Sequence, residues 1–243
     1  MRLLGSAAAV AILAAAFLLT AHVSADAAEG GRSSVRFGFS RGSATETYAP
    51  ETLSSRIPSA ERYHLGWRYQ AADPWRAVAT LARGAFAIAD PDFPGTIHQR
   101  TETQALVGGM LAYDVLGGSL GLGAGYAARW VEVSSSAKAP GTAPAFLFAP
   151  WHLFHGVTFM MDYRRPLFGP FGLELEVEAL PQGFAHLGDT RLSLPSTWGV
   201  GVHPRLTFWG DRFALGYRYE RTQSALYGRE LSAMTASFAL SGF

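Results

Sequence analysis

The chain has 243 residues, a formal net charge of +1 and no cysteine, and 49% of its residues are hydrophobic. Without cysteine, it forms neither a disulfide framework nor a zinc–thiolate site. Arg2 accounts for the net charge, so the chain that follows the leader is close to neutral. It contains no run of basic residues of the kind that binds nucleic acid, and we expect no nucleic-acid partner.

The N-terminal segment has the organisation of a secretory signal peptide. Its basic residue precedes the uninterrupted apolar stretch Ala7–Leu19, and Val23-Ser24-Ala25 offers small residues for cleavage. We predict a signal peptide in residues 1–25, with Ala25 or Ala27 as the last residue removed. The alternative is a transmembrane anchor, which needs a longer apolar stretch to cross about 30 Å of hydrocarbon. Residues 26–34 are expected to form a short periplasmic lead-in.

The rest of the chain carries segments with the composition of β-strands, rich in Tyr, Phe, Trp, Val, Leu and Gly. The predicted strands are 35–43, 61–72, 77–89, 102–116, 119–134, 150–166, 171–181, 197–209, 212–224 and 230–243. The connections alternate in length, as in the long polar Gly42–Ala60 and the tight Leu116–Ser119. This alternation predicts an up-and-down antiparallel meander, and short turns opposite long loops are typical of outer-membrane barrels.

Alternate positions in these strands separate large apolar side chains from polar ones. In 61–72, for example, Tyr63 and Trp67 share one face while Arg62 lies on the other. In a soluble ligand-binding barrel of the lipocalin type, the apolar faces would all fill one lumen. Its radius would be only about 10 Å, given ~4.7 Å between strands and ~40° of tilt. We therefore predict an all-β, up-and-down antiparallel transmembrane β-barrel of about ten strands over residues 35–243, with its apolar faces against lipid.

The stretch F171-G-L-E-L-E-V-E-A-L-P181 alternates three glutamates with aliphatic residues. With the aliphatic side chains in lipid, the carboxylates point into the lumen, where they repel one another and need basic partners. The expected lumenal charge network comprises Glu174, Glu176, Glu178, Arg62, Arg68, Asp114, Arg129, Asp162, Arg164, Arg205, Arg218 and Glu220, with Glu102 on the same predicted face. This network would close a narrow barrel; the alternatives are a lining that selects solutes and a catalytic carboxylate. Strand register decides which groups pair, and the sequence does not fix it.

Histidines gather near the predicted external rim. His98, His152 and His186 are expected there, together with Asp189. These residue types suit a metal site or an acid–base pair that faces the outer leaflet. His152 and His155 are three residues apart on one strand, so they point to opposite faces and cannot chelate one ion without a bulge. No cofactor is expected.

The chain ends in A236-S-F-A-L-S-G-F243. This segment resembles the C-terminal strand of Gram-negative outer-membrane β-barrel proteins, in which a terminal phenylalanine marks the last strand for the insertion machinery. The resemblance covers residues 32–243 as architecture and implies a location in the bacterial outer membrane. Ten strands is also the number in the omptin proteases. Their paired aspartates and Asp–His couple have no matching positions here, so their activity is not carried over.

These features predict a non-enzymatic barrel that acts as a structural or interaction protein, with a place in an envelope-spanning assembly as one setting for that role. The alternatives are a narrow porin-like channel for small solutes and an outer-leaflet enzyme that acts on lipid A or peptides. The expected partners are outer-membrane lipid, including lipopolysaccharide, and envelope proteins met through the loops or the periplasmic turns.

Overall fold

The computed structural model describes residues 31–48, 53–71, 74–89, 97–135, 151–187, 192–225 and 227–241. The predicted signal peptide and the terminal Phe243 lie outside these residues, so both predictions stay predictions. Within the described ranges, no helix is long and apolar enough to cross a membrane.

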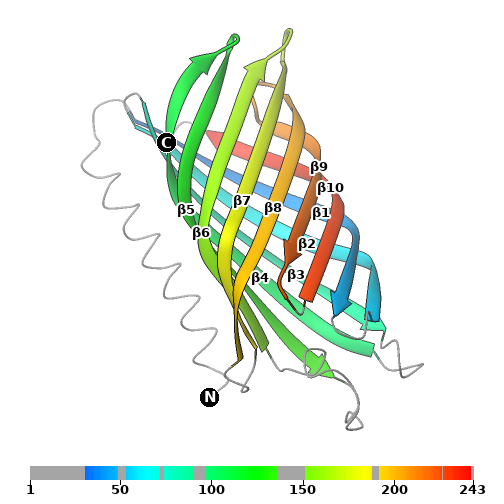
Figure 1. The fold of residues 1–243 in the computed structure, drawn as a ribbon. Helices are drawn as coiled ribbons and strands as arrows, with labels where there is room; N and C mark the ends of the chain where they lie inside the picture. The colour runs from blue at the N-terminus through cyan, green and yellow to red at the C-terminus, as the bar shows by residue number, and fades with distance from the viewer. Residues whose placement is uncertain are drawn as a thin grey trace.

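The described chain forms ten long antiparallel strands (Figure 1). They are β1 (Arg32–Tyr48), β2 (Leu53–Gln70), β3 (Trp75–Ala89), β4 (Ile97–Val115), β5 (Gly118–Ser135), β6 (Trp151–Pro166), β7 (Phe171–Leu187), β8 (Leu192–Phe208), β9 (Phe213–Gln223) and β10 (Tyr227–Ser241). Each strand pairs with its neighbours in sequence, and β1 pairs with β10 to close the barrel. The predicted strand number, direction and connectivity are confirmed.

The two ends of the barrel differ. The connections β2–β3, β4–β5, β6–β7 and β8–β9 are short and lie at the upper end in Figure 1, which we call the turn end. The opposite end carries the two longest connections, β3–β4 and β5–β6, and is called the loop end. The other connections there are as short as the turns, so the predicted alternation of short and long connections is only partly found. Several strands reach further toward it than predicted: β2 starts at Leu53 and β4 at Ile97, in polar sequence without an apolar period. Pairing with neighbouring strands keeps these polar segments extended.

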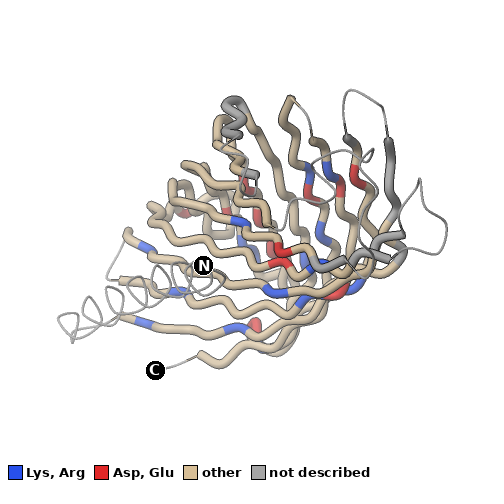
Figure 2. Tube along the Cα trace, turned by 90° about the horizontal axis from the view of Figure 1, so that it is seen from below, with Lys and Arg blue, Asp and Glu red and all other residues tan. Residues whose placement is uncertain are grey.

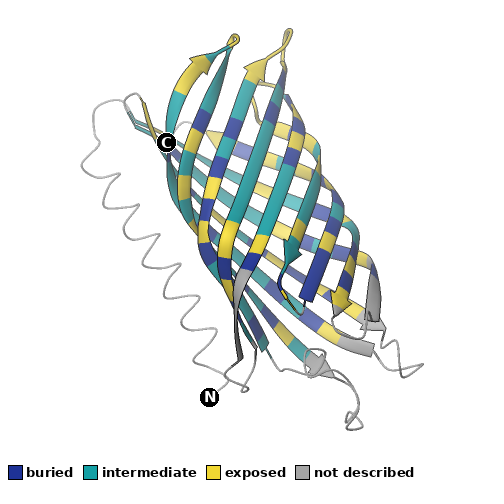
Figure 3. Ribbon diagram, viewed as in Figure 1, coloured by how far each residue is buried: buried dark blue, intermediate teal, exposed yellow. Residues whose placement is uncertain are grey.

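The burial pattern alternates along each strand (Figure 3). In β6, Phe154, Met160 and Asp162 are buried, whereas Val157 and Phe159 are 54% and 57% exposed. Large exposed side chains recur around the outer wall: Phe37, Tyr63, Leu122, Tyr126, Leu206, Leu215, Tyr217, Met234 and Leu240. The apolar faces therefore point outward, as expected for a barrel whose outer solvent is lipid. This arrangement excludes the lipocalin-type alternative, in which the apolar side chains would fill the lumen.

Aromatic side chains gather near both ends of the barrel. Rings of Phe171, Phe208, Trp209 and Phe213 form a chain of contacts at the turn end. Trp130 and Trp151 stack toward the loop end, with ring centroids 4.8 Å apart. Two aromatic zones of this kind are the girdles of outer-membrane barrels. Tyr227 is also aromatic and starts a strand at the loop end, but it is not part of a girdle: the residue is 2% exposed inside the barrel, where its hydroxyl donates a hydrogen bond to Glu46.

The β4–β5 turn holds a leucine in a strained backbone conformation. Leu116 and Gly117 form a two-residue turn with φ angles of 52° and 69°. Both central residues of this turn type need positive φ, which asparagine adopts more readily than leucine.

We expect Leu116→Asn to stabilise the barrel by about 1 kcal/mol, because asparagine relieves this strain. Unfolding in urea, followed by tryptophan fluorescence, would measure the change. Leu167→Asn is the matched control, since Leu167 is also an exposed turn leucine but does not have positive φ. An equal gain in both variants would attribute the effect to removing an exposed leucine.

Candidate functional site

Basic and acidic residues both occur along the strands (Figure 2). Near the turn end they form a set that we call the turn-end network: Arg36, Arg68, Arg76, Asp162, Arg164, Glu174, Glu176, His203 and Arg205. Strand alternation places each of them on the inner face. The network draws on β1, β2, β3, β6, β7 and β8.

Glu174 is the centre of the turn-end network. Four arginines contact its carboxylate: Arg36 at 2.6 Å, Arg164 at 2.9 Å, Arg205 at 3.1 Å and Arg68 at 3.2 Å. The Glu174 side chain is only 2% exposed. A carboxylate withdrawn from water to this degree is stable only when charge-assisted hydrogen bonds replace its hydration.

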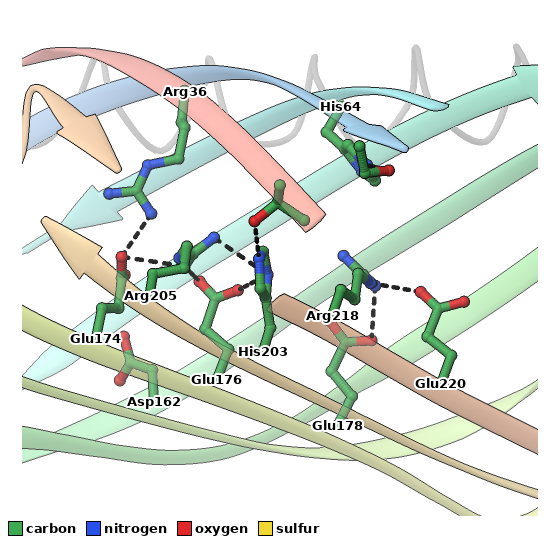
Figure 4. A network of polar contacts seen from close by, with 12 residues as sticks. Arg36, His64, Asp162, Glu174, Glu176, Glu178, His203, Arg205, Arg218 and Glu220 are labelled. Carbon is green, nitrogen blue, oxygen red and sulfur yellow. Dashed lines mark hydrogen bonds and ion pairs between the residues drawn. The ribbon is translucent and has the colours of Figure 1, made fainter. Parts of the chain in front are cut away.

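Glu176 extends this network along β7. Arg205 lies between Glu174 and Glu176 and contacts both (Figure 4). His203 Nδ1 lies 3.6 Å from Glu176, and its Nε2 is 2.9 Å from the Thr235 hydroxyl. Two neighbouring glutamates therefore share one guanidinium, which offsets their mutual repulsion.

Toward the loop end lies a second set, the loop-end network: Glu46, Arg62, Arg100, Glu102, Glu178, Arg218, Glu220, Tyr227 and Arg229. Arg62 forms an ion pair with Glu102 at 2.8 Å and donates a hydrogen bond to Glu220 at 2.9 Å. Arg218 lies between Glu178 and Glu220 (Figure 4).

Both networks cross the lumen. Arg68 on β2 contacts Glu174 and Glu176 on β7, which lies on the opposite side of the strand order. Toward the loop end, Arg62 on β2 reaches Glu220 on β9, and Arg229 on β10 reaches Glu102 on β4. These ion pairs tie separate walls together at two levels.

The structure brings most of the predicted lumenal residues together. Ion pairs include Glu174, Glu176, Glu178, Arg62, Arg68, Asp162, Arg164, Arg205, Arg218 and Glu220. Asp114 differs: it is exposed near the β4–β5 turn and has no ion-pair partner among the described residues. Arg129 is inward and buried but contacts no carboxylate within the described ranges.

Sequence reasoning missed several members of the networks. They are Arg36, Glu46, Arg76, Arg100, His203 and Arg229. Glu46, Arg76, Arg100 and Arg229 lie one to three residues beyond predicted strand ends. The inward alternation reaches these four residues when it is continued past the predicted strand ends, but only the strand pairing shows that the strands extend that far.

The predicted rim histidines do not form one site. His152 is 1% exposed and points inward, whereas His186 is on the outer face, where its Nε2 lies 3.0 Å from His155 Nε2. The Tyr126 hydroxyl contacts His155 Nδ1. Asp189 and the side chain of His98 lie outside the described residues. Among those described, no three His, Asp or Glu side chains are placed to hold a metal ion.

The lumen contains a cavity of about 340 Å³, whose lining extends from Asp211 at the turn end to Thr222 toward the loop end. Its lining includes residues from both networks, among them Arg68, Glu178 and Arg218, and an apolar wall with Val78 and Leu106. Glycines keep space for charged groups: a Cβ at Gly121 would collide with the Asp162 carboxylate.

Comparison with known proteins supports the fold. No protein-family model and no curated protein matches the chain. The outer-membrane protease OmpT from Escherichia coli has a similar structure, with a TM-score of 0.60 and 10% identity over 88% of this chain and 97% of that chain. This chain has the fold of the outer-membrane β-barrel proteins. Its closed barrel and outward apolar wall place it in the bacterial outer membrane.

Other outer-membrane barrels are less similar. The barrel matches the translocator domain of the autotransporter NalP from Neisseria meningitidis with 13% identity and a TM-score of 0.45, over 96% of this chain and 97% of that chain. It matches Ail from Yersinia pestis with 9% identity and a TM-score of 0.41, over 86% and 99%.

Proposed function

We propose that the protein is a non-enzymatic structural or interaction barrel whose lumen is closed by its own charges. The supporting observation is that ion pairs join separate walls at two levels, through Arg68 with Glu174 and through Arg62 with Glu220. Breaking any of these ion pairs would leave a buried charge without its partner, so the pairs oppose opening of the lumen. The turn end faces the periplasm and the loop end the exterior, as in other barrels with this asymmetry.

The lumenal ion pairs stiffen the barrel, and its outer wall, loops and turns carry out the function by contacting lipid and other proteins. The outer wall contacts outer-membrane lipid, including lipopolysaccharide, and the loops and turns meet envelope proteins, within an envelope-spanning assembly. Residues 1–25 are the leader removed on export. We assign no catalytic role to the barrel. The rim pair expected from the sequence, for example His152 with Asp189, would need an accessible His152, and its side chain is buried inside the barrel.

A narrow channel is the second candidate, and the lumenal cavity of about 340 Å³ is the observation that favours it. Charged groups from both networks line this cavity, so a continuous water path would be selective for ions. A measurement of ion conductance distinguishes this channel from a closed structural barrel.

Single-channel recording in planar bilayers tests the proposal. We expect no steady conductance from the parent protein, and leak or loss of folding when Glu174, Glu176 and Glu178 are all changed to Gln. The matched control changes the same number of outward carboxylates, Glu61, Glu132 and Glu230, to Gln and stays silent. Steady parent conductance, with an ion selectivity altered only by the lumenal substitutions, would establish the channel instead.

A further inference from the structure

Arg129 is the exception among the lumenal arginines. Its side chain lies on the inner face of β5 and the residue is 8% exposed. Every other inward arginine contacts a carboxylate: Arg36, Arg62, Arg68, Arg76, Arg100, Arg164, Arg205, Arg218 and Arg229. Within the part of the chain that the structure describes, Arg129 has none.

The contacts of Arg129 hold the guanidinium in place without neutralising it. Nη1 donates to the Thr222 hydroxyl at 3.3 Å, across the lumen on β9. The guanidinium carbon lies 4.4 Å from the centroid of the Phe154 ring, so the group also rests on an aromatic face. These contacts fix its position. Glu102 and Glu220 attract the guanidinium only from beyond ion-pair distance, so the buried group has no direct carboxylate partner among the described residues.

The atoms of Arg129 that lack partners share one edge of the group. Both Nε and Nη2 are buried and have no hydrogen-bond partner. In the planar guanidinium, these two N–H groups point the same way and match the spacing of two oxygens in a carboxylate or a phosphate. The edge that remains open is therefore the bidentate one.

Space for a ligand lies beside this edge. Arg129, Phe154 and Thr222 all line the lumenal cavity of about 340 Å³. The Thr222 oxygen accepts from Arg129, so its own hydroxyl hydrogen is available to a second acceptor. Inward arginines also outnumber inward carboxylates among the described residues, so the lumen has a positive excess that an anion would balance.

We propose that Arg129 is the anchor of a binding site for a small oxyanion, a carboxylate or phosphate group that enters the lumen and accepts two hydrogen bonds from Nε and Nη2. Phe154 forms one wall of the site, and Thr222 supplies a hydroxyl. The site exists whether or not the barrel conducts, because binding needs access from only one end.

Binding of inorganic phosphate by protein purified from outer membranes in detergent tests this site. Broadening of the ³¹P resonance, measured at constant ionic strength against chloride, gives the affinity. We expect saturable binding to the parent, displaced by acetate, and at least tenfold weaker binding to Arg129→Gln and Arg129→Lys. Lysine keeps the charge but loses the bidentate edge. Arg41→Gln is the control, since Arg41 is exposed on the outer face with Glu61 and does not line the cavity, and binding should be unchanged in this variant.

Absence of saturable phosphate binding to the parent would overturn the proposal, and so would unchanged affinity in Arg129→Gln. If Arg129→Lys binds phosphate as tightly as the parent does, the positive charge alone attracts the anion, and the bidentate hydrogen bonds proposed here are wrong. If Arg129→Gln does not fold, Thr222→Val provides the test, because it keeps the guanidinium and removes its anchor. We expect severalfold weaker phosphate binding in that variant, and unchanged binding would count against the site.

Discussion

Changing Glu174 to Gln is expected to destabilise the barrel by about 3–5 kcal/mol, the range for removing one partner from a buried ion pair. Four arginines point at this carboxylate, and none of them contacts another carboxylate at a shorter distance except Arg68 and Arg205 with Glu176. Glutamine has nearly the same volume, so the change isolates the lost charge. The four guanidiniums would then repel one another in a space from which water is largely excluded.

Unfolding of the refolded protein by urea in detergent, followed by tryptophan fluorescence, measures this loss. Glu230→Gln is the matched control, because Glu230 is half-exposed on the outer face and pairs with Arg221 at 3.3 Å. Exposed pairs contribute about 0–1 kcal/mol, so this variant should unfold close to the parent. Equal midpoints for the two variants would mean that the turn-end network does not hold the barrel together.

Most of the fold was predictable because one physical pattern repeats. Alternation such as Leu173-Glu174-Leu175-Glu176 requires two different environments on the two faces of a strand. The number of apolar side chains then decides which face is outside, since a narrow lumen cannot contain them all. Turn and loop lengths supply the connectivity, so neither the strand order nor the barrel closure needed long-range information.

Strand ends were less predictable. Glu46, Arg100 and Arg229 stand in polar sequence near the loop end, where apolar alternation has faded. The structure nevertheless extends β1, β4 and β10 through them and turns their side chains inward. Pairing across strands fixes these positions, and single-strand patterns do not contain that information.

The histidines show the effect of one irregularity. By simple alternation His186 would share the inner face with Glu178, but the β7–β8 register shifts between Leu180 and Gly183. The shift reverses the faces of the residues that follow, so Ala185 is buried and His186 points outward to His155. This bulge has no clear signal in the sequence. The predicted rim site assumed that β7 continues without a bulge, and that assumption was wrong for His186.

Changing Phe159 to Arg tests the outer wall. Phe159 lies in the middle of β6, is 57% exposed, and is flanked across the strands by Ala124 and Ala179. Between the aromatic zones, this position faces the hydrocarbon, so an arginine there would be desolvated without a partner. The expected loss in unfolding free energy is about 2–4 kcal/mol, the range for arginine near the midplane of an outer-membrane barrel.

The control for this prediction is Thr45→Arg, since Thr45 is also exposed on the outer face but lies near the loop end of β1. An arginine there reaches water or lipid headgroups, and the free energy should change by about 0.5 kcal/mol or less. Folding efficiency into lipid vesicles, measured beside urea unfolding, should fall for Phe159→Arg alone. If both variants fold into vesicles as the parent does, the middle of β6 is not in contact with hydrocarbon, and the exposed apolar wall must instead be covered by protein.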